Sequence, residues 1–387
     1  LNRPEKEFPK YVTSPLATTI SISDTSGAGW GRVLGLQIPD LLLVSEIKYT
    51  DNNFFSRAKS LLLPLKYGFS TTSWHRLASF APTYMDSRFF YPGLTLRLTP
   101  FIIYDRATTT LDLFKFGGEI SISKELLSHL FGTLSYEISE VKTKKPSEDE
   151  YSPFRLENKV MPFLLYDRLD HPINPTKGIF VSSLLSYINA IEEGVSKNFI
   201  KYELTAKLFF SVKKKLIFGT YFHYGNSKSF EAGRLPDEER FTLGGNKGMR
   251  GFSDDGVSQY YPDGSIRISY NEDDGKWGMP YGGDTVFNGS FEVRFPIIRK
   301  IGLWGSSFID YGALAERLSE ICPKSVRMSF GFGLRWLLGD QIPFRLDYGI
   351  ILDKRCKEMS SDSDPENVKC LLNEEVGNIH FGILYTF

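Results

Sequence analysis

Apolar and polar residues alternate with a period of two along much of the chain, most regularly in its C-terminal half. In residues 285–295, for example, Phe291 and Phe295 fall on one face, whereas Ser290 and Glu292 fall on the other. This is the period of a β-strand that has one apolar and one polar face. The sequence therefore predicts an all-β fold, and the clearest strands cover residues 200–210, 285–295, 302–312, 326–338, 344–350 and 378–387.

Two features of these strands separate a membrane barrel from a soluble sandwich, since both folds would show the alternation. The predicted strands reach about ten residues or more, whereas strands of soluble proteins average about five or six. Aromatic residues such as Tyr348, Tyr385 and Phe387 also lie near strand ends. Both features favour a transmembrane antiparallel β-barrel, whose apolar face meets lipid and whose polar face lines the lumen.

The connections between predicted strands alternate between short turns and long polar loops. The long loops cover residues 142–151, 226–284, 316–324 and 353–375. Short turns at one rim and long loops at the other are typical of outer-membrane barrels. At roughly 24 residues for a strand and its connection, the chain of 387 residues predicts about 16 strands.

The first and last strands are predicted to meet at a lateral seam. The first strand covers residues 15–24, although prolines make all strand positions before residue 93 poorly defined. This strand has few large apolar residues, so we expect a comparatively weak seam. The seam residues would be Leu16, Ile20 and Ile22 from the first strand and Ile379, Phe381, Ile383 and Phe387 from the last.

Composition narrows the class of protein further. The chain has 46 basic and 46 acidic residues, so it has no excess positive charge for binding nucleic acid. No apolar run approaches the roughly 18 residues that a membrane-spanning helix needs. G-x-S-x-G and H-E-x-x-H motifs are absent from the sequence, and its five histidines are scattered. We therefore expect no enzymatic activity, metal ion or cofactor.

The three cysteines do not form a C-x-x-C motif, which argues against a zinc or redox site. Cys356 and Cys370 lie close together in one polar loop, and an oxidising compartment would allow a disulfide between them. The alternative is that all three cysteines remain thiols.

The predicted loop 226–284 far exceeds the length of about 12–15 residues beyond which structureless loops are uncommon. Its middle, from Gly244 to Phe252, contains four glycines, which permit tight turns, and places Arg250 at a loop tip. Glu292 and Asp310 fall on the lumen face of the two following strands, where they are candidate partners for this guanidinium. The alternative is that both carboxylates only line a wet lumen.

These motifs resemble those of the BamA/TamA superfamily of outer-membrane assembly and two-partner secretion barrels, also called the bacterial surface antigen family. In that family a long extracellular loop enters the lumen with a [VIL]-R-G-[FY] motif, which here reads Met249-Arg250-Gly251-Phe252. The acidic residue of the next strand corresponds to Glu292. An F-x-D-x-G motif on the strand after it corresponds to Phe308 to Gly312, including Asp310. The resemblance extends from about residue 85 to the C-terminus.

The resemblance implies that Arg250 holds the loop inside the lumen through Glu292 and Asp310, beside Phe308, and that the seam can open. We expect replacement of Arg250 by alanine to lower stability by about 1–3 kcal/mol, because water in a wet lumen would partly solvate the carboxylates that lose their partner. The resemblance also implies a location in the outer membrane of a Gram-negative bacterium, or of an organelle of bacterial descent.

The family suggests three functions. The first is an assembly factor that helps β-barrel clients to fold into the outer membrane, through the seam. The second is a pore that translocates a secreted polypeptide, and the third is a barrel that anchors a missing N-terminal domain. The expected partners are outer-membrane lipid, an unfolded client or secreted polypeptide, and accessory periplasmic subunits. We expect residues 1–387 to form one barrel domain without a periplasmic POTRA domain, either as a barrel-only protein or as a portion of a longer one.

Overall fold

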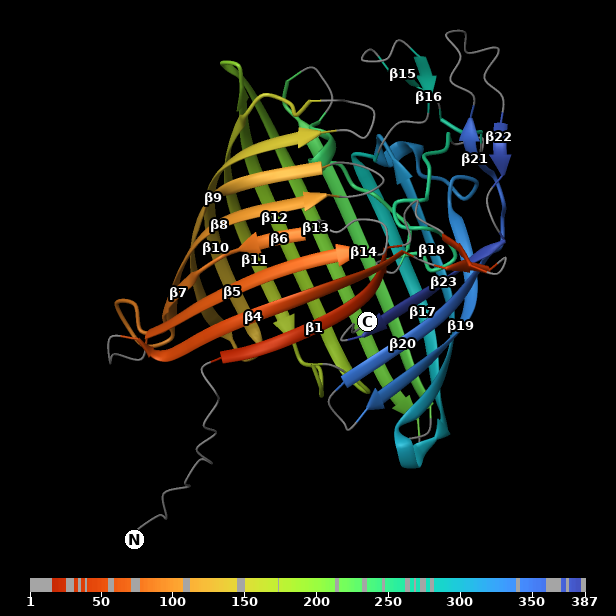
Figure 1. The fold of residues 1–387 in the computed structure, drawn as a ribbon, viewed down its shortest axis with the longest axis horizontal. Coiled ribbons are helices and arrows are strands. Elements are labelled where there is room, and N and C mark those ends of the chain that lie inside the picture. Colours follow the sequence, from red (N-terminus) through yellow and green to blue (C-terminus); the bar gives the residue numbers. More distant parts are fainter. Residues whose placement is uncertain are drawn as a thin grey trace.

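The computed structural model shows one antiparallel sheet that closes on itself as a barrel (Figure 1). It describes residues 16–25, 31–33, 36–38, 40–54, 59–70, 77–106, 112–144, 150–172, 174–212, 216–231, 235–245, 248–261, 265–267, 269–271, 276–278, 282–338, 342–359, 370–373 and 376–383.

The barrel strands follow one another around the sheet in chain order. They are β1 (Leu16–Thr25), β4 (Asp40–Phe54), β5 (Lys59–Ser70), β6 (Leu77–Phe80), β7 (Thr83–Asp86), β8 (Leu94–Arg106), β9 (Asp112–Leu127), β10 (Leu130–Lys144), β11 (Arg155–Asp167), β12 (Gly178–Glu192), β13 (Val195–Val212), β14 (Leu216–Ser229), β17 (Thr285–Ile298), β18 (Leu303–Ala315), β19 (Arg327–Leu338), β20 (Ile342–Ile351) and β23 (Gly377–Ile383).

Shorter elements lie in the connections. They are the hairpins β2 (Gly31–Val33)–β3 (Leu36–Ile38), β15 (Ser269–Asn271)–β16 (Lys276–Gly278) and β21 (Cys356–Met359)–β22 (Cys370–Asn373), and the 3-10 helices η1 (Asp237–Glu239), η2 (Arg299–Ile301) and η3 (Leu318–Glu320). No helix in the described part of the chain is long and apolar enough to cross a bilayer.

The sheet contains 17 named strands, but β6 and β7 are two halves of one, since both pair with β5 and with β8. The break falls at Ala81 and Pro82, because proline has no backbone N–H to donate to the neighbouring strand. Counting the halves together leaves 16 barrel strands, as the sequence predicts. Pro64, by contrast, stays inside β5, opposite Lys48 of β4.

The alternation of the sequence separates the two faces of the barrel wall. On β17 the outward-facing Phe291 is 57% exposed, whereas its neighbour Glu292 is 1% exposed. On β19 the outward-facing Phe332 is 55% exposed, whereas the inward-facing Ser329 is 0% exposed. A continuous apolar outer surface of this kind is the lipid-facing band of a membrane barrel, not the surface of a soluble protein. The predicted fold class is confirmed.

The hairpins β15–β16 and β21–β22, which belong to two of the long connections, lie at one end of the barrel (Figure 1). The predicted alternation of turn and loop is wrong at one hairpin of this rim, where only Glu193 and Gly194 join β12 to β13. Both residues have positive φ angles, 48° and 82°, which suit a two-residue hairpin turn. The predicted loop 226–284 also starts late, because residues 226–229 continue β14.

The barrel closes between β1 and β23. All ten residues of β1 pair with β4, and all seven of β23 pair with β20. Between β1 and β23 themselves, the described residues form one pair, Ser23 with Gly382.

Candidate functional site

Part of the connection between β14 and β17 folds back into the lumen. Gly244 and Gly245 have φ angles of 134° and 71°, which residues with a side chain rarely adopt. The amide of Gly245 donates to the carbonyl of Phe252 at 3.2 Å and so closes a tight loop around Arg250. The flanking apolar side chains form a buried cluster of Phe241, Leu243, Met249, Phe252, Val257, Val286, Leu314 and Ile351.

Arg250 is bound by side chains of two neighbouring strands. Its Nε and Nη2 donate to the two carboxylate oxygens of Asp310 at 2.9 and 2.7 Å, a bidentate arrangement, and its backbone amide adds a bond of 3.0 Å. Its Nη1 donates to Glu292 at 2.6 Å and its Nη2 to Ser290 at 2.8 Å. The guanidinium also stacks over the ring of Phe308, 3.4 Å from its centroid. The structure therefore brings together Arg250, Glu292, Asp310 and Phe308.

A second layer of charges surrounds this site. Arg335 donates to Glu292 at 2.9 Å and to Asp347 at 2.5 Å, and Arg294 donates to Glu292 at 2.7 Å. Asp347 lies 3.6 Å from Arg250 and 3.3 Å from Arg345. The period-two pattern places these residues on the polar face, but the sequence carries no signal that they meet at one level of the barrel.

The charges of this network pair with one another and are withdrawn from water. Arg250 is 4% exposed and Asp347 is 0% exposed. Burial alone would lower the pKa of Arg250, but the negative charges of Asp310, Glu292 and Asp347 outweigh it and raise that pKa above its ordinary value. The expectation of a wet lumen around these carboxylates is therefore wrong at this site. An arrangement in which each charge binds another holds a loop in place, and does not leave a group poised for proton transfer.

The loop backbone also lies directly against the last strands of the barrel. A Cβ built on Gly251 would lie 2.6 Å from the Cβ of Ser329, and one built on Gly349 would meet the carbonyl of Arg250. Asn378 of β23 donates to the carbonyl of Gly251 at 2.9 Å. The loop motif is therefore in contact with the strand that forms one side of the closing junction.

A second anchor, which the sequence analysis did not identify, holds the start of the same connection. Glu239 of η1 forms ion pairs with Lys159 of β11 and Lys201 of β13. Its neighbour Glu238 forms an ion pair with Arg155 of β11. The connection is thus attached by its first residues to β11 and β13 and by Arg250 to β17 and β18.

We expect acid to release this second anchor. Burial alone would raise the pKa of the Glu239 carboxyl, but Lys159 and Lys201 outweigh burial and hold it below its ordinary value. Its stabilising contribution is therefore present above about pH 4.3, the ordinary pKa of glutamate, and is lost as the pH falls through the lower folded-state pKa. Hydrogen–deuterium exchange of residues 235–245, corrected for the intrinsic pH dependence, should rise below that pH.

Glu239→Gln is expected to show faster exchange at neutral pH and to lose this acid dependence. Glu193→Gln, which changes an exposed carboxyl in a turn at the same rim, is the matched control and should behave like the parent chain. An unaltered acid response in Glu239→Gln would contradict the assignment.

The remaining predicted positions lie apart from these anchors. Leu16, Ile20 and Ile22 belong to β1, and Ile379, Phe381 and Ile383 to β23, whereas Phe387 lies outside the described residues. Cys356 is opposite Asn373, and Cys370 is opposite Met359, so the two cysteines are not cross-strand partners. The side chains of that hairpin lie outside the described part, and the disulfide stays a prediction.

Comparison with known proteins gives matches along nearly the whole chain. A sequence model of the Omp85 superfamily domain matches residues 53–387. The crystal structure of BamA from Haemophilus ducreyi lacking POTRA domains 1–3 is similar, with a TM-score of 0.66 and 16% identity, covering 94% of this chain and 69% of that one.

Two structures of CdiB are also similar to this chain. CdiB from Acinetobacter baumannii has a TM-score of 0.52 and 11% identity, and the match covers 95% of this chain and 59% of that one. CdiB from Escherichia coli has a TM-score of 0.55 and 13% identity, and the match covers 96% of this chain and 62% of that one. This chain therefore spans less than two thirds of either CdiB chain. At these identities, the three structural likenesses show a shared fold.

Proposed function

Because the chain belongs to the Omp85 superfamily, we propose that it assists β-barrel client proteins to fold and insert into the outer membrane, through the junction between β1 and β23. Membership confirms the family resemblance drawn from the Arg250 and Asp310 motifs. The chain is an outer-membrane β-barrel of a Gram-negative bacterium or of an organelle of bacterial descent. Its proposed partners are outer-membrane lipid, an unfolded client and accessory periplasmic subunits.

The observation that carries this proposal is that β1 and β23, the first and last barrel strands, pair with each other to close the sheet. One described pair, Ser23 with Gly382, closes a barrel in which β1 pairs along its whole length with β4. When this junction opens, each of its two strand edges presents backbone donors and acceptors on which another strand can pair. A client strand that adds to this edge would satisfy its own backbone groups before it enters the bilayer, where unsatisfied groups are costly.

The lumen anchor supports the same mechanism. Opening the junction requires β1 and β23 to separate while the rest of the wall keeps its shape. Asn378 joins β23 to the loop motif, and Arg250 joins that motif to β17 and β18. The loop therefore holds β23 to β17 and β18, so that separation of β1 from β23 does not unravel the ladders next to β23.

A polypeptide translocation pore is the second candidate, and one feature of the lumen favours it. Residues of β4, β5, β7, β8 and β9 line a polar cavity of about 520 Å³. Lys48, Arg97 and Glu119 lie among its lining residues. A polar cavity of this size would accommodate a segment of extended polypeptide.

Locking the junction distinguishes the two functions. Residues directly opposite each other across an antiparallel pair lie within the Cα range that a disulfide can bridge, so Ser23→Cys with Gly382→Cys should cross-link β1 to β23 on oxidation. In lipid vesicles the oxidised double variant is expected to lose acceleration of client insertion and to regain it on reduction. Each single variant is the control, since the chain has three cysteines of its own.

Full insertion activity in the oxidised, cross-linked barrel would refute the proposed route through the junction. Translocation of a polypeptide through the lumen would survive the same cross-link. Loss of insertion with retained peptide passage into the vesicles would therefore indicate both activities, and passage alone would favour the pore.

A further inference from the structure

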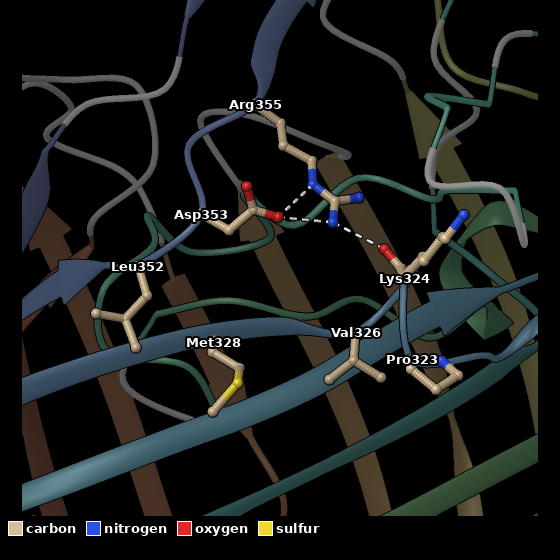
Figure 2. A pocket seen from close by; sticks show the side chains of 7 residues that line it. All are labelled: Pro323, Lys324, Val326, Met328, Leu352, Asp353 and Arg355. Carbon is tan, nitrogen blue, oxygen red and sulfur yellow. Dashed lines mark hydrogen bonds and ion pairs between the residues drawn. The ribbon is translucent and has the colours of Figure 1, made fainter.

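A crevice lies on the outer face of the barrel at the rim that carries the long connections (Figure 2). It has a volume of about 610 Å³ and lies between the start of β19 and the segment that follows β20. One side is lined by the apolar side chains of Val326, Met328 and Leu352, and the other by Asp353, Arg355 and Lys324, with Pro323 at the end.

The apolar side of the crevice belongs to the lipid-facing surface. Met328 is 41% exposed and Leu352 is 57% exposed, although both are large and apolar. Met328 shares its face of β19 with Phe332 and Leu334, which continue the outer apolar band down the barrel. The crevice is therefore the upper end of that band, where hydrocarbon gives way to the headgroup region.

The polar side of the crevice carries more positive than negative charge. Lys324 and Arg355 line it with a single carboxylate, Asp353, and the adjacent Lys354 is exposed. Within the described part of the chain, the Lys324 ammonium has no carboxylate partner. The Lys324 ammonium must therefore bind an anion or remain solvated, and basic pockets at the membrane surface bind lipid head groups.

Arg355 is held in position before any ligand arrives. Its Nε donates to Asp353 at 2.7 Å, and its Nη2 donates to the carbonyl of Lys324 at 2.8 Å (Figure 2). Its guanidinium also lies over the ring of Tyr260, 4.4 Å from the centroid. A fixed guanidinium loses little freedom on binding, and its planar donors suit the oxygens of a phosphate.

We propose that this crevice binds an anionic membrane lipid that carries a phosphate group. The phosphate lies against Lys324 and Arg355, and an acyl chain follows Val326, Met328 and Leu352 into the apolar band. This site is separate from the lumen anchor and does not depend on the insertion activity proposed above. It attaches a specific lipid to β19 and β20, next to the strand that closes the barrel.

Photolabelling of the full chain in lipid nanodiscs tests the proposal. The discs consist of phosphatidylcholine with a small fraction of phosphatidylglycerol whose acyl chain carries a diazirine. After irradiation, we expect mass spectrometry to find the label concentrated at Met328 and Leu352 relative to Phe291, which is exposed on the same outer face. Unlabelled phosphatidylglycerol should suppress this labelling, whereas extra phosphatidylcholine and inorganic phosphate should not.

Variants that change charge but not shape sharpen the test. Lys324→Gln should lower the labelling about fivefold, since one basic residue near an anionic surface is worth about 1 kcal/mol. Asp353→Asn should raise it, because it removes the carboxylate that competes for Arg355. Lys197→Gln, at an exposed lysine on the same rim, is the matched control and should leave the labelling unchanged.

Three results would overturn the proposal. Labelling of Met328 and Leu352 equal to that of Phe291 would show only general contact with lipid. Suppression of the labelling by inorganic phosphate would show a site for free anions. Unchanged labelling in Lys324→Gln would exclude the phosphate contact. Heat-modifiable migration on a gel verifies that each variant is folded. If Lys324→Gln fails to fold, the opposite expectation for Asp353→Asn decides the outcome.

Discussion

Replacement of Arg250 by alanine is expected to free the loop motif from the barrel wall and to lower the free energy of unfolding by about 3–5 kcal/mol. The reason is that Asp310 loses its bidentate side-chain partner and keeps only neutral donors, the backbone amide of residue 250 and the hydroxyl of Ser290. This carboxylate is 1% exposed, so water cannot replace the guanidinium. The range exceeds the 1–3 kcal/mol that a wet lumen would allow, because the structure buries the whole network.

Denaturant titration of the refolded barrel in lipid vesicles measures this loss, and limited proteolysis of residues 235–261 reports the release of the loop. Arg250→Lys should recover part of the stability, since an ammonium keeps the charge but not the bidentate geometry. Arg317→Ala, which removes an exposed arginine of the β18–β19 connection, is the matched control. Equal protease resistance in Arg250→Ala and Arg317→Ala would disprove the anchoring role.

Replacement of Gly349 by alanine is expected to push the loop motif away from β20 without removing any charge. A Cβ at this position would meet the carbonyl of Arg250. Asp310 accepts from the Arg250 amide and Asn378 donates to the Gly251 carbonyl, so the backbone on both sides of that carbonyl is held and cannot turn aside as a flexible side chain would. Overpacking of this kind typically costs about 1–3 kcal/mol. We therefore expect a lower midpoint of unfolding and increased proteolysis of the loop.

The control for this variant is Gly118→Ala in β9. A Cβ at Gly118 would have its nearest neighbour, the Cα of Pro100, at 3.9 Å, which is ordinary van der Waals contact. Both changes add one methyl group to a barrel strand, but only the one at Gly349 collides with the loop. If both variants unfold at the same denaturant concentration, close approach of the loop to β20 does not contribute to stability.

Together these variants separate the two ways in which the loop is held. Arg250→Ala removes the ion pairs of the guanidinium but leaves room for the loop against β20. Gly349→Ala fills that room with a methyl group but leaves all the charged residues in place. Both act on a segment that Asn378 joins to β23. Insertion assays on the same variants would therefore show whether the β1–β23 junction depends on the position of the loop.

The sequence alone determined the barrel and the inward direction of its charged residues. Successive side chains of a strand point to opposite faces, so the alternation around Glu292 places it toward the lumen whatever the neighbouring strands are. The order of motifs then identified Arg250 and Asp310 as partners. These inferences needed only local geometry and the resemblance of short segments to a family.

Only the tertiary structure decided which inward-facing charges meet. Asp347 and Arg335 surround Glu292 because the register of β17, β18, β19 and β20 brings them to one level, and register depends on pairing between distant segments. The contact of Glu239 with Lys159 joins residues 80 positions apart, and the crevice beside Met328 forms where two connections pass each other. Alternation along one strand records which face a side chain occupies. It contains no information on the height at which that side chain meets its neighbours, and that height is set by the closure of the whole sheet.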